Sequence, residues 1–544
     1  MTSFNFKRHE IESKRFLLVD DFGDMRSMLR MMLNSIGVRA IDTANNGAEA
    51  IAALAREHYD IVLCDYNLGR GKNGQDVLEE ARYRRLISLD AIFVMLTAEN
   101  TREWVMGAVE YEPDSYLTKP FTKDLLKSRL ERLILKRQDL QQVAAAVSVH
   151  DYPAALRVLD EKIAGQPQNL GELTRQKAEI LYRAGEYRRA EVVYQQVLAT
   201  REMTWARLGL GKTFYATGRL EHAARLFQGL MQENQRLTAA YDWLARTQQA
   251  LGRWEEAQQV LQQALIHSPK SLLRQRALGD LALKNGDTSV ADQAFTEALK
   301  LGRNSVYKAP LIYVRLAWLK SRSGRAGAAL KIVDEMEREF NSSDEARLYA
   351  SMTRAMVEQH RGSPDEARRL MRQTEALYAA LGANAAAEQM LEMARSYAEL
   401  GELGNAQTLL EQVICNNHDD RMLLQQVEAL IAQYALAVDA KRHVASIRRE
   451  IVKLNNRGVK LAKTGRYSEA LRLFSDAVAT MPDNKVVNLN AARVMIMTMH
   501  HGGIAQEQLA RVRDLLDHAR TLDPAEPALH QVQKMYQDLM ASSA

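Results

Sequence analysis

Acidic side chains near the start of this 544-residue chain are spaced in a way that could hold a metal ion. Asp20 and Asp21 follow directly after the apolar run Phe16-Leu-Leu-Val19, and Asp65 follows a second apolar run. Carboxylate oxygens are the ligands that a hard divalent cation such as Mg²⁺ prefers. Phosphoryl transfer depends on positioning and charge neutralisation, to which the later Lys119 could contribute. The spacing therefore predicts an acidic phosphorylation pocket.

Five short apolar or β-branched runs are expected to form the strands that position these side chains. They alternate with helical patterns, which predicts a parallel sheet with helices on both faces. The predicted strands are residues 15–19, 40–44, 61–65, 91–97 and 115–119. Ligands of such sheets bind at the carboxyl ends of the strands, and the acidic and hydroxyl residues fall at those ends.

A different organisation begins after Phe121, where strand patterns vanish and helical patterns continue. Gly185, Gly218, Gly252 and Gly286 are spaced by 33, 34 and 34 residues, and an alanine follows each of them five residues later. A period of about 34 residues is typical of a repeat of two helices. Glycine suits the turn between two helices, and alanine lets them approach closely. The rest of the chain is predicted to be all-α.

Composition narrows the class of protein. Hydrophobic residues make up 47% and charged residues 26%, and no apolar run approaches the roughly 18 residues of a membrane-spanning helix. The two cysteines, Cys64 and Cys415, lack metal-ligand spacing, and the first residues lack a signal-peptide pattern. A cytoplasmic protein is therefore expected. The net charge of +5 is not gathered in a basic stripe, so nucleic acid is not an expected partner.

Residues 14–135 resemble the receiver domain of bacterial two-component response regulators. The resemblance rests on the ordered set Asp20, Asp21, Asp65, Thr97 and Lys119-Pro120. It implies an α/β fold with a doubly wound, five-stranded parallel sheet. It also implies a sensor histidine kinase or a phosphotransfer protein as the phosphoryl donor.

The same resemblance assigns roles within the pocket. Asp65 is expected to be the phosphoacceptor, assisted by the hydroxyl of Thr97 and the ammonium of Lys119. The expected Mg²⁺ ligands are the side chains of Asp20, Asp21 and Asp65 and the backbone carbonyl of Asn67. The Lys119-Pro120 bond is expected to be cis, because only X-Pro bonds adopt that isomer cheaply.

Receivers also carry residues that respond to the phosphoryl group. Thr97 and Tyr116 match the switch pair of the family, and Asn67 and Glu99 match positions that tune dephosphorylation. The surface that changes is expected to include a helix near residues 101–109. After Asp65 the chain departs from the family, because a glycine-rich basic loop ending at Gly74 replaces the common Met-Pro.

The repeats resemble the tetratricopeptide repeat family over residues 143–535, most closely over residues 203–269. The family forms a solenoid whose inner groove is lined by the first helix of each pair. The candidate groove residues are Arg175, Tyr182, Arg183, Trp205, Lys212, Tyr215, Arg246 and Arg276. Basic and aromatic side chains would suit a protein or peptide that carries carboxylates.

The expected domains follow from these two resemblances. They are an N-terminal extension (1–13), the receiver (14–135), a helical linker that starts the first repeat (136–150), and a tetratricopeptide superhelix with a C-terminal capping helix (151–544). A helix unbroken from residue 122 to about residue 147 is expected to couple receiver and repeats.

The function expected from this organisation is that of a response regulator with a protein-binding output. It is not expected to be an enzyme beyond its own phosphoryl transfer and dephosphorylation. Two alternatives stay open at this point. One is a DNA-binding transcriptional regulator, and the other is a constitutive repeat scaffold whose receiver mediates formation of a homodimer.

Overall fold

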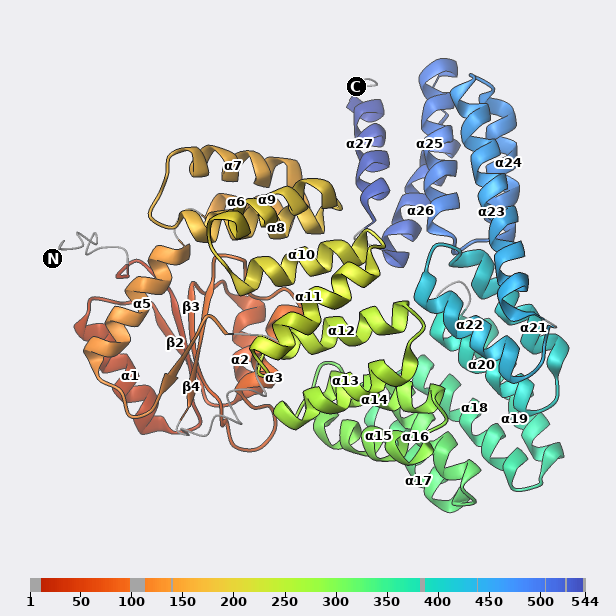
Figure 1. Cartoon of the computed structure of the whole chain (residues 1–544), viewed down its shortest axis with the longest axis horizontal. Helices are drawn as coiled ribbons and strands as arrows, with labels where there is room; N and C mark the ends of the chain where they lie inside the picture. The colour runs from red at the N-terminus through yellow and green to blue at the C-terminus, as the bar shows by residue number, and fades with distance from the viewer. Residues whose placement is uncertain are drawn as a thin grey trace. The chain divides into compact units, whose positions relative to one another are not determined.

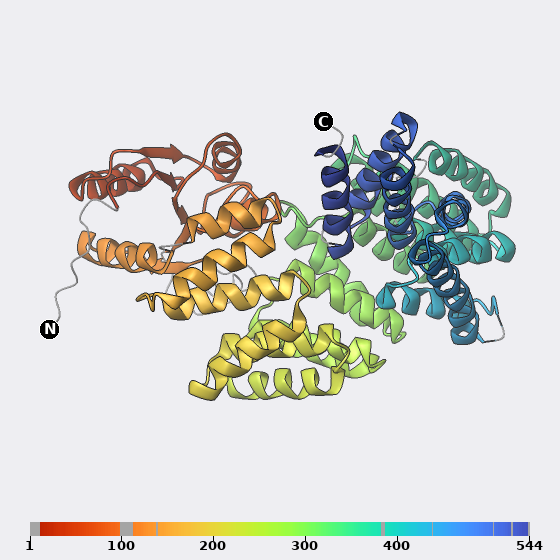
Figure 2. The same cartoon turned by 90° about the horizontal axis from the view of Figure 1, so that it is seen from above.

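The computed structural model describes residues 11–97, 113–137, 140–381, 387–437, 439–503, 505–523 and 526–541. The chain divides between Ile312 and Tyr313 into two compact units. The first unit holds a parallel sheet followed by helix pairs, and the second unit holds further helices (Figures 1 and 2). Among the described residues, no helix is long and apolar enough to cross a membrane.

The first unit begins with a five-stranded parallel sheet in the order β2-β1-β3-β4-β5. Its strands are β1 (Phe16–Val19), β2 (Ile41–Ala44), β3 (Ile61–Asp65), β4 (Ile92–Thr97) and β5 (Ser115–Thr118). Each predicted strand agrees with the structure to within one residue at either end. The prediction of a parallel sheet is confirmed.

Alternating side chains of the strands build one apolar layer on each face of the sheet. The helices involved are α1 (Gly23–Ser35), α2 (Gly47–Arg56), α3 (Gly74–Tyr83) and α5 (Lys123–Arg137). Helices α1 and α5 cover one face of the sheet, and α2 and α3 cover the other (Figure 1). Phe16 and Leu18 pack with residues of α1 and α5, whereas Leu17 and Val19 pack with residues of α2 and α3. Successive residues of a strand point to opposite faces, so a continuous apolar run is expected when both faces are covered. The sheet is doubly wound, as predicted.

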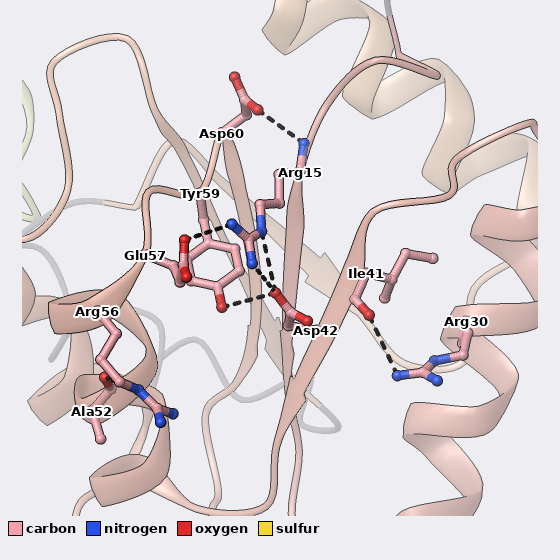
Figure 3. A network of polar contacts seen from close by, with 9 residues as sticks. All are labelled: Arg15, Arg30, Ile41, Asp42, Ala52, Arg56, Glu57, Tyr59 and Asp60. Carbon is pink, nitrogen blue, oxygen red and sulfur yellow. Dashed lines mark hydrogen bonds and ion pairs between the residues drawn. The ribbon is translucent and has the colours of Figure 1, made fainter.

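A polar network ties the amino ends of the strands together (Figure 3). The Arg15 guanidinium lies 2.9 Å from Asp42 and 2.7 Å from Glu57, and the Arg15 amide donates to Asp60 over 2.9 Å. The Tyr59 hydroxyl donates to Asp42 over 3.0 Å. Burial, together with this bond to Asp42, raises the pKa of Tyr59 to about 12. The network therefore lies at the opposite end of the strands from Asp20, Asp21 and Asp65.

Helix pairs fill the rest of the first unit. They comprise α6 (Gln141–Ser148), α7 (Tyr152–Ala164), α8 (Leu170–Arg183), α9 (Tyr187–Thr200), α10 (Thr204–Ala216), α11 (Leu220–Glu233), α12 (Thr238–Ala250), α13 (Trp254–His267), α14 (Leu272–Lys284) and α15 (Thr288–Gly302). Helix α16 (Pro310–Arg322) spans the division between the units. The predicted all-α repeats are confirmed.

The second unit continues the same kind of pairing. Its helices are α17 (Ala326–Glu339), α18 (Asp344–His360), α19 (Pro364–Leu381), α20 (Ala387–Glu399), α21 (Leu403–Asn416), α22 (Arg421–Gln433), α23 (Ala440–Lys463), α24 (Tyr467–Thr480), α25 (Lys485–Gly502), α26 (Gln506–Leu522) and α27 (Pro527–Ala541). Polar contacts join the alternate helices α16, α18 and α20 and the end of α22, which Tyr434 directly follows. His360 lies 2.8 Å from the Ser321 hydroxyl and 3.4 Å from Glu399, which accepts from Tyr434 over 2.7 Å.

Small residues set the spacing of the repeats. The turn glycines Gly185, Gly218, Gly252 and Gly286 have φ between 74° and 79°. A Cβ added at Gly218, Gly252 or Gly286 would meet nothing within 4 Å, so the left-handed backbone alone requires glycine at these three positions. Gly211 differs, because its added Cβ would lie 2.6 Å from the buried Phe227 ring. Glycine serves there to admit a large side chain.

The predicted unbroken helix between receiver and repeats is wrong. Helix α5 ends at Arg137 and α6 begins at Gln141. Side chains bridge the two parts instead. Lys136 and Arg137 of α5 lie 3.3 and 3.8 Å from Glu172 of α8, and Arg137 also forms an ion pair with Asp114, which precedes β5. Contacts across the helix break therefore hold the sheet domain against the first repeats.

Candidate functional site

Three carboxylates meet at the carboxyl edge of the sheet. Oxygens of Asp20, Asp21 and Asp65 all lie within 4.8 Å of one another. The strands explain this, because β1 and β3 are parallel neighbours with Val19 paired to Cys64, so their next residues share one edge. Asp20 is fully buried and Asp65 is 6% exposed. The predicted acidic cluster is present.

Lys119 places one positive charge inside this cluster. Its Nζ lies 2.7 Å from Asp20 Oδ2 and 3.1 Å from Asp65 Oδ1. The Lys119–Pro120 peptide bond is cis, as predicted. Backbone amides add two more donors, from Phe22 to Asp20 over 2.9 Å and from Tyr66 to Asp65 over 3.0 Å.

The cluster still carries more negative than positive charge. Burial and the nearby charge of Asp20 together raise the pKa of Asp65 to about 6, although Lys119 opposes both effects. Asp21 Oδ1 is buried and accepts no hydrogen bond from any residue that the structure describes. A buried oxygen without a donor is costly unless a cation or water meets it. This donor set fits a hard divalent cation.

The remaining predicted receiver residues lie around the cluster. Thr97 ends β4 and is 7% exposed. Tyr116 of β5 is half-buried and packs against the apolar layer under α2 and α3. Asn67 is exposed, and its side-chain oxygen accepts from the Gly69 amide over 3.4 Å. Glu99 and the predicted helix at 101–109 lie outside the described residues.

Gly74 is a site residue that the sequence prediction missed. It begins α3, and its amide donates to the Tyr66 carbonyl over 2.8 Å. A Cβ at Gly74 would lie 2.2 Å from the backbone oxygen of Asp65. Only glycine therefore lets α3 start against the backbone of the acidic residue. A single glycine at the end of a loop gives no signal of this kind in the sequence.

The predicted groove residues all lie on the first helices of successive pairs. Helix α8 carries Arg175, Tyr182 and Arg183, α10 carries Trp205, Lys212 and Tyr215, and Arg246 and Arg276 lie on α12 and α14. The structure brings several of them together around Trp243 of α12, a residue that the sequence analysis did not single out. Tyr215 lies 5.5 Å from its ring centroid, and the Lys212 and Arg246 cations lie 5.4 and 5.1 Å away.

Positive charges converge on Lys212. Burial lowers the pKa of Lys212, and three guanidinium groups nearby, those of Arg246, Arg175 and Arg183, lower it further, whereas Glu179 opposes them. In the part of the chain that the structure describes, Lys212 makes no ion pair. Such a half-buried cation among other cations attracts an anion more strongly than an isolated surface lysine does. We name Lys212, Trp243 and Arg246 the basic cluster.

Comparisons with known proteins agree with this geometry. The response regulator receiver domain family matches residues 16–131. The chemotaxis protein CheY-3 of Vibrio cholerae serotype O1 is 30% identical over 122 residues, which are 22% of this chain and 92% of that protein. The chain belongs to the response regulator receiver family. Its receiver domain is also 32% identical to the chemotaxis protein CheY of Pseudomonas aeruginosa over 120 residues, which are 22% of this chain and 94% of that protein.

Solved structures and repeat families complete the comparison. The response regulator protein TrrA of Thermotoga maritima is 33% identical and covers 22% of this chain and 98% of its own, with a TM-score of 0.20. Tetratricopeptide repeat families match residues 175–235, 214–281, 276–344 and 348–373. The chain therefore joins a receiver domain to tetratricopeptide repeats. These matches confirm the receiver resemblance, and they confirm the tetratricopeptide resemblance over residues 175–373.

Proposed function

We propose that this protein is a response regulator of a two-component phosphorelay, in which Asp65 accepts a phosphoryl group from a histidine kinase or a phosphotransfer protein. One observation carries the proposal. A buried carboxylate that ends β3 lies 3.1 Å from the Lys119 ammonium, inside a group of three carboxylates within 4.8 Å of one another. The receiver family supports the same assignment.

Mg²⁺ is the cation that we propose for the cluster. The side chains of Asp20, Asp21 and Asp65 and the carbonyl of Asn67 would hold it, with Asp20 acting through water. The buried Asp21 Oδ1, which lacks a hydrogen-bond donor among the described residues, supports this assignment. When bound, the ion supplies positive charge to the oxygens of the transferring phosphoryl group.

The protein's own residues perform the transfer. An Asp65 oxygen attacks phosphorus as the bond from phosphorus to the donor's histidine nitrogen breaks, and an acyl phosphate forms on Asp65. Lys119 neutralises charge on the arriving oxygens, and the Thr97 hydroxyl hydrogen-bonds to them. Thr97 and Tyr116 then act as the switch, and Asn67 and Glu99 set how fast water removes the phosphoryl group. The chain needs no other enzymatic activity for this function.

The repeats supply the output of this proposed function by binding a protein. Their basic cluster combines the Lys212 and Arg246 cations with the face of Trp243. Carboxylates form charge-assisted hydrogen bonds to such cations, and an apolar stem can pack on the ring. We therefore propose a protein segment with acidic side chains as the ligand of the groove.

Metal removal tests the phosphorylation pocket. Calorimetric titration of the full chain with beryllofluoride, a phosphoryl mimic, is expected to show one site per chain in the presence of Mg²⁺. Because metal charge must offset the carboxylates, chelation of Mg²⁺ is expected to abolish the binding. The Asp42→Asn variant, altered at the opposite end of the strands, is the matched control and is expected to bind as the wild type does. Binding that persists without a divalent cation, or absent binding with it, would contradict the proposal.

A further inference from the structure

The loop that follows Asp65 contacts a distant turn of the repeats. This is the glycine-rich segment in which the chain departs from the receiver pattern. The Lys72 ammonium donates to the backbone oxygen of Asn304 over 2.8 Å, and the Asn304 amide group donates to the Gly71 carbonyl over 2.8 Å. The two segments are separated by 232 residues in the sequence. The pair of bonds is reciprocal, so each segment both donates and accepts.

A second contact lies at the other end of α3. The rings of Tyr83, the last residue of α3, and Tyr307 meet edge to face with centroids 5.4 Å apart. Lys72 also pairs with Glu80 of α3 at 3.0 Å. Helix α3 is therefore held at both ends by the turn that joins α15 to α16. We name the contacts of Gly71 and Lys72 with Asn304, together with the tyrosine pair, the repeat latch.

The same loop also touches the acidic cluster. A Cβ added at Gly69 would lie 3.2 Å from Asp21 Oδ2, so the backbone of the loop passes directly beside a proposed metal ligand. Gly69 and Gly71 have φ of 74° and 101°, a conformation that residues with a side chain rarely adopt. Only two residues thus separate Gly69, which lies beside Asp21, from Lys72, whose ammonium donates to Asn304. A movement of Asp21 or of the loop backbone beside it can therefore reach the repeats through this short stretch of main chain.

We propose that this loop is the docking surface through which the receiver binds the α15–α16 turn of its own repeats, and that filling the acidic pocket changes the strength of this contact. The inference rests on the proposed function, because the ligand that fills the pocket is the phosphoryl group with its metal. The latch residues lie at the surface, so the contact can open without disrupting either apolar core. Coupling between two sites is reciprocal, so opening the latch must change ligand affinity at the pocket by the same factor.

Hydrogen exchange on the full chain tests the contact itself. The double variant Lys72→Met with Asn304→Leu removes both donors of the latch and leaves the acidic residues intact. Residues 303–309 are expected to exchange faster in this variant than in the wild type. Lys300→Met is the matched control, because Lys300 is exposed and pairs with Glu297 of its own helix. The single variant Lys72→Met provides a milder second case should the double variant fold poorly.

Calorimetry with Mg²⁺ and beryllofluoride then tests the coupling. The double variant is expected to change the affinity for the mimic by at least about 5-fold, and Lys300→Met is expected to leave it unchanged. Unchanged exchange at 303–309 in the double variant overturns the latch. Faster exchange with unchanged affinity overturns the coupling. If the wild type did not bind beryllofluoride with Mg²⁺, the proposed function would be overturned instead. Hydrogen exchange at residues 303–309 is measured without ligand, so it would still decide whether the latch contact exists.

Discussion

Replacing Lys119 with methionine is expected to slow phosphorylation of Asp65 by about 100-fold, the typical effect of removing one preorganised charge donor from a reaction centre. The Lys119 ammonium lies 2.7 Å from Asp20 and 3.1 Å from Asp65, and no other lysine or arginine of the described residues forms an ion pair with either carboxylate. Without it, three carboxylates face the incoming oxygens with the metal as their only counter-charge. The initial rate with acetyl phosphate and Mg²⁺ measures the effect.

Lys123→Met is the matched control for this experiment. Lys123 begins α5 four residues later and is exposed, so its loss changes the net charge equally but not the pocket. We expect the control to react at the wild-type rate. If Lys119→Met also reacted at that rate, Lys119 would not act on the reacting oxygens, and the assignment of the pocket would be wrong.

Reversing the charge of Lys212 is expected to weaken the binding of an acidic peptide by at least about 10-fold, because loss of one close charge pair typically costs more than that factor. The Lys212 cation lies over Trp243 beside Arg246. Three guanidinium groups already disfavour its charge, so an incoming carboxylate would relieve repulsion as well as form a contact. Fluorescence anisotropy with a labelled hexaglutamate peptide measures the affinity of the full chain.

Two controls keep the groove experiment specific. Lys300→Glu makes the same charge change on α15, a second helix of its pair, and is expected to retain binding. A hexalysine peptide is expected not to bind the wild type. If Lys212→Glu and Lys300→Glu lost affinity equally, the binding would depend on net charge alone. The proposal that the basic cluster binds the acidic segment would then be wrong.

Local patterns in the sequence account for the parts of the fold that were predicted correctly. The strand boundaries follow from apolar runs that end in polar residues, because a doubly covered parallel strand needs side chains of one kind on both faces. The position of the pocket could be predicted in the same way, because Asp20 and Asp65 come directly after the apolar residues of two neighbouring strands. The repeats could be predicted because glycines recur at a nearly constant period, and each of these glycines has a left-handed backbone.

Contacts between distant segments account for what could not be predicted. Leu140 lies outside any helix although the residues around it favour helices, and ion pairs of Arg137 with Asp114 and of Lys136 with Glu172 stabilise the observed arrangement. Trp243 of α12 could not be predicted as a site residue, because its contacts with Lys212 and Tyr215 come from α10. The hydrogen bond between Lys72 and Asn304 links residues 232 positions apart, a pairing that no local pattern encodes.

Mapping the phosphorylated residue decides whether Asp65 is the phosphoacceptor. Full-length protein is incubated with acetyl phosphate and Mg²⁺, the acyl phosphate is trapped by borohydride reduction, and the modified residue is mapped by mass spectrometry. We predict one modification per chain, on Asp65, and none in the Asp65→Asn variant. An unmodified wild type, or the same modification in Asp65→Asn, would contradict the account.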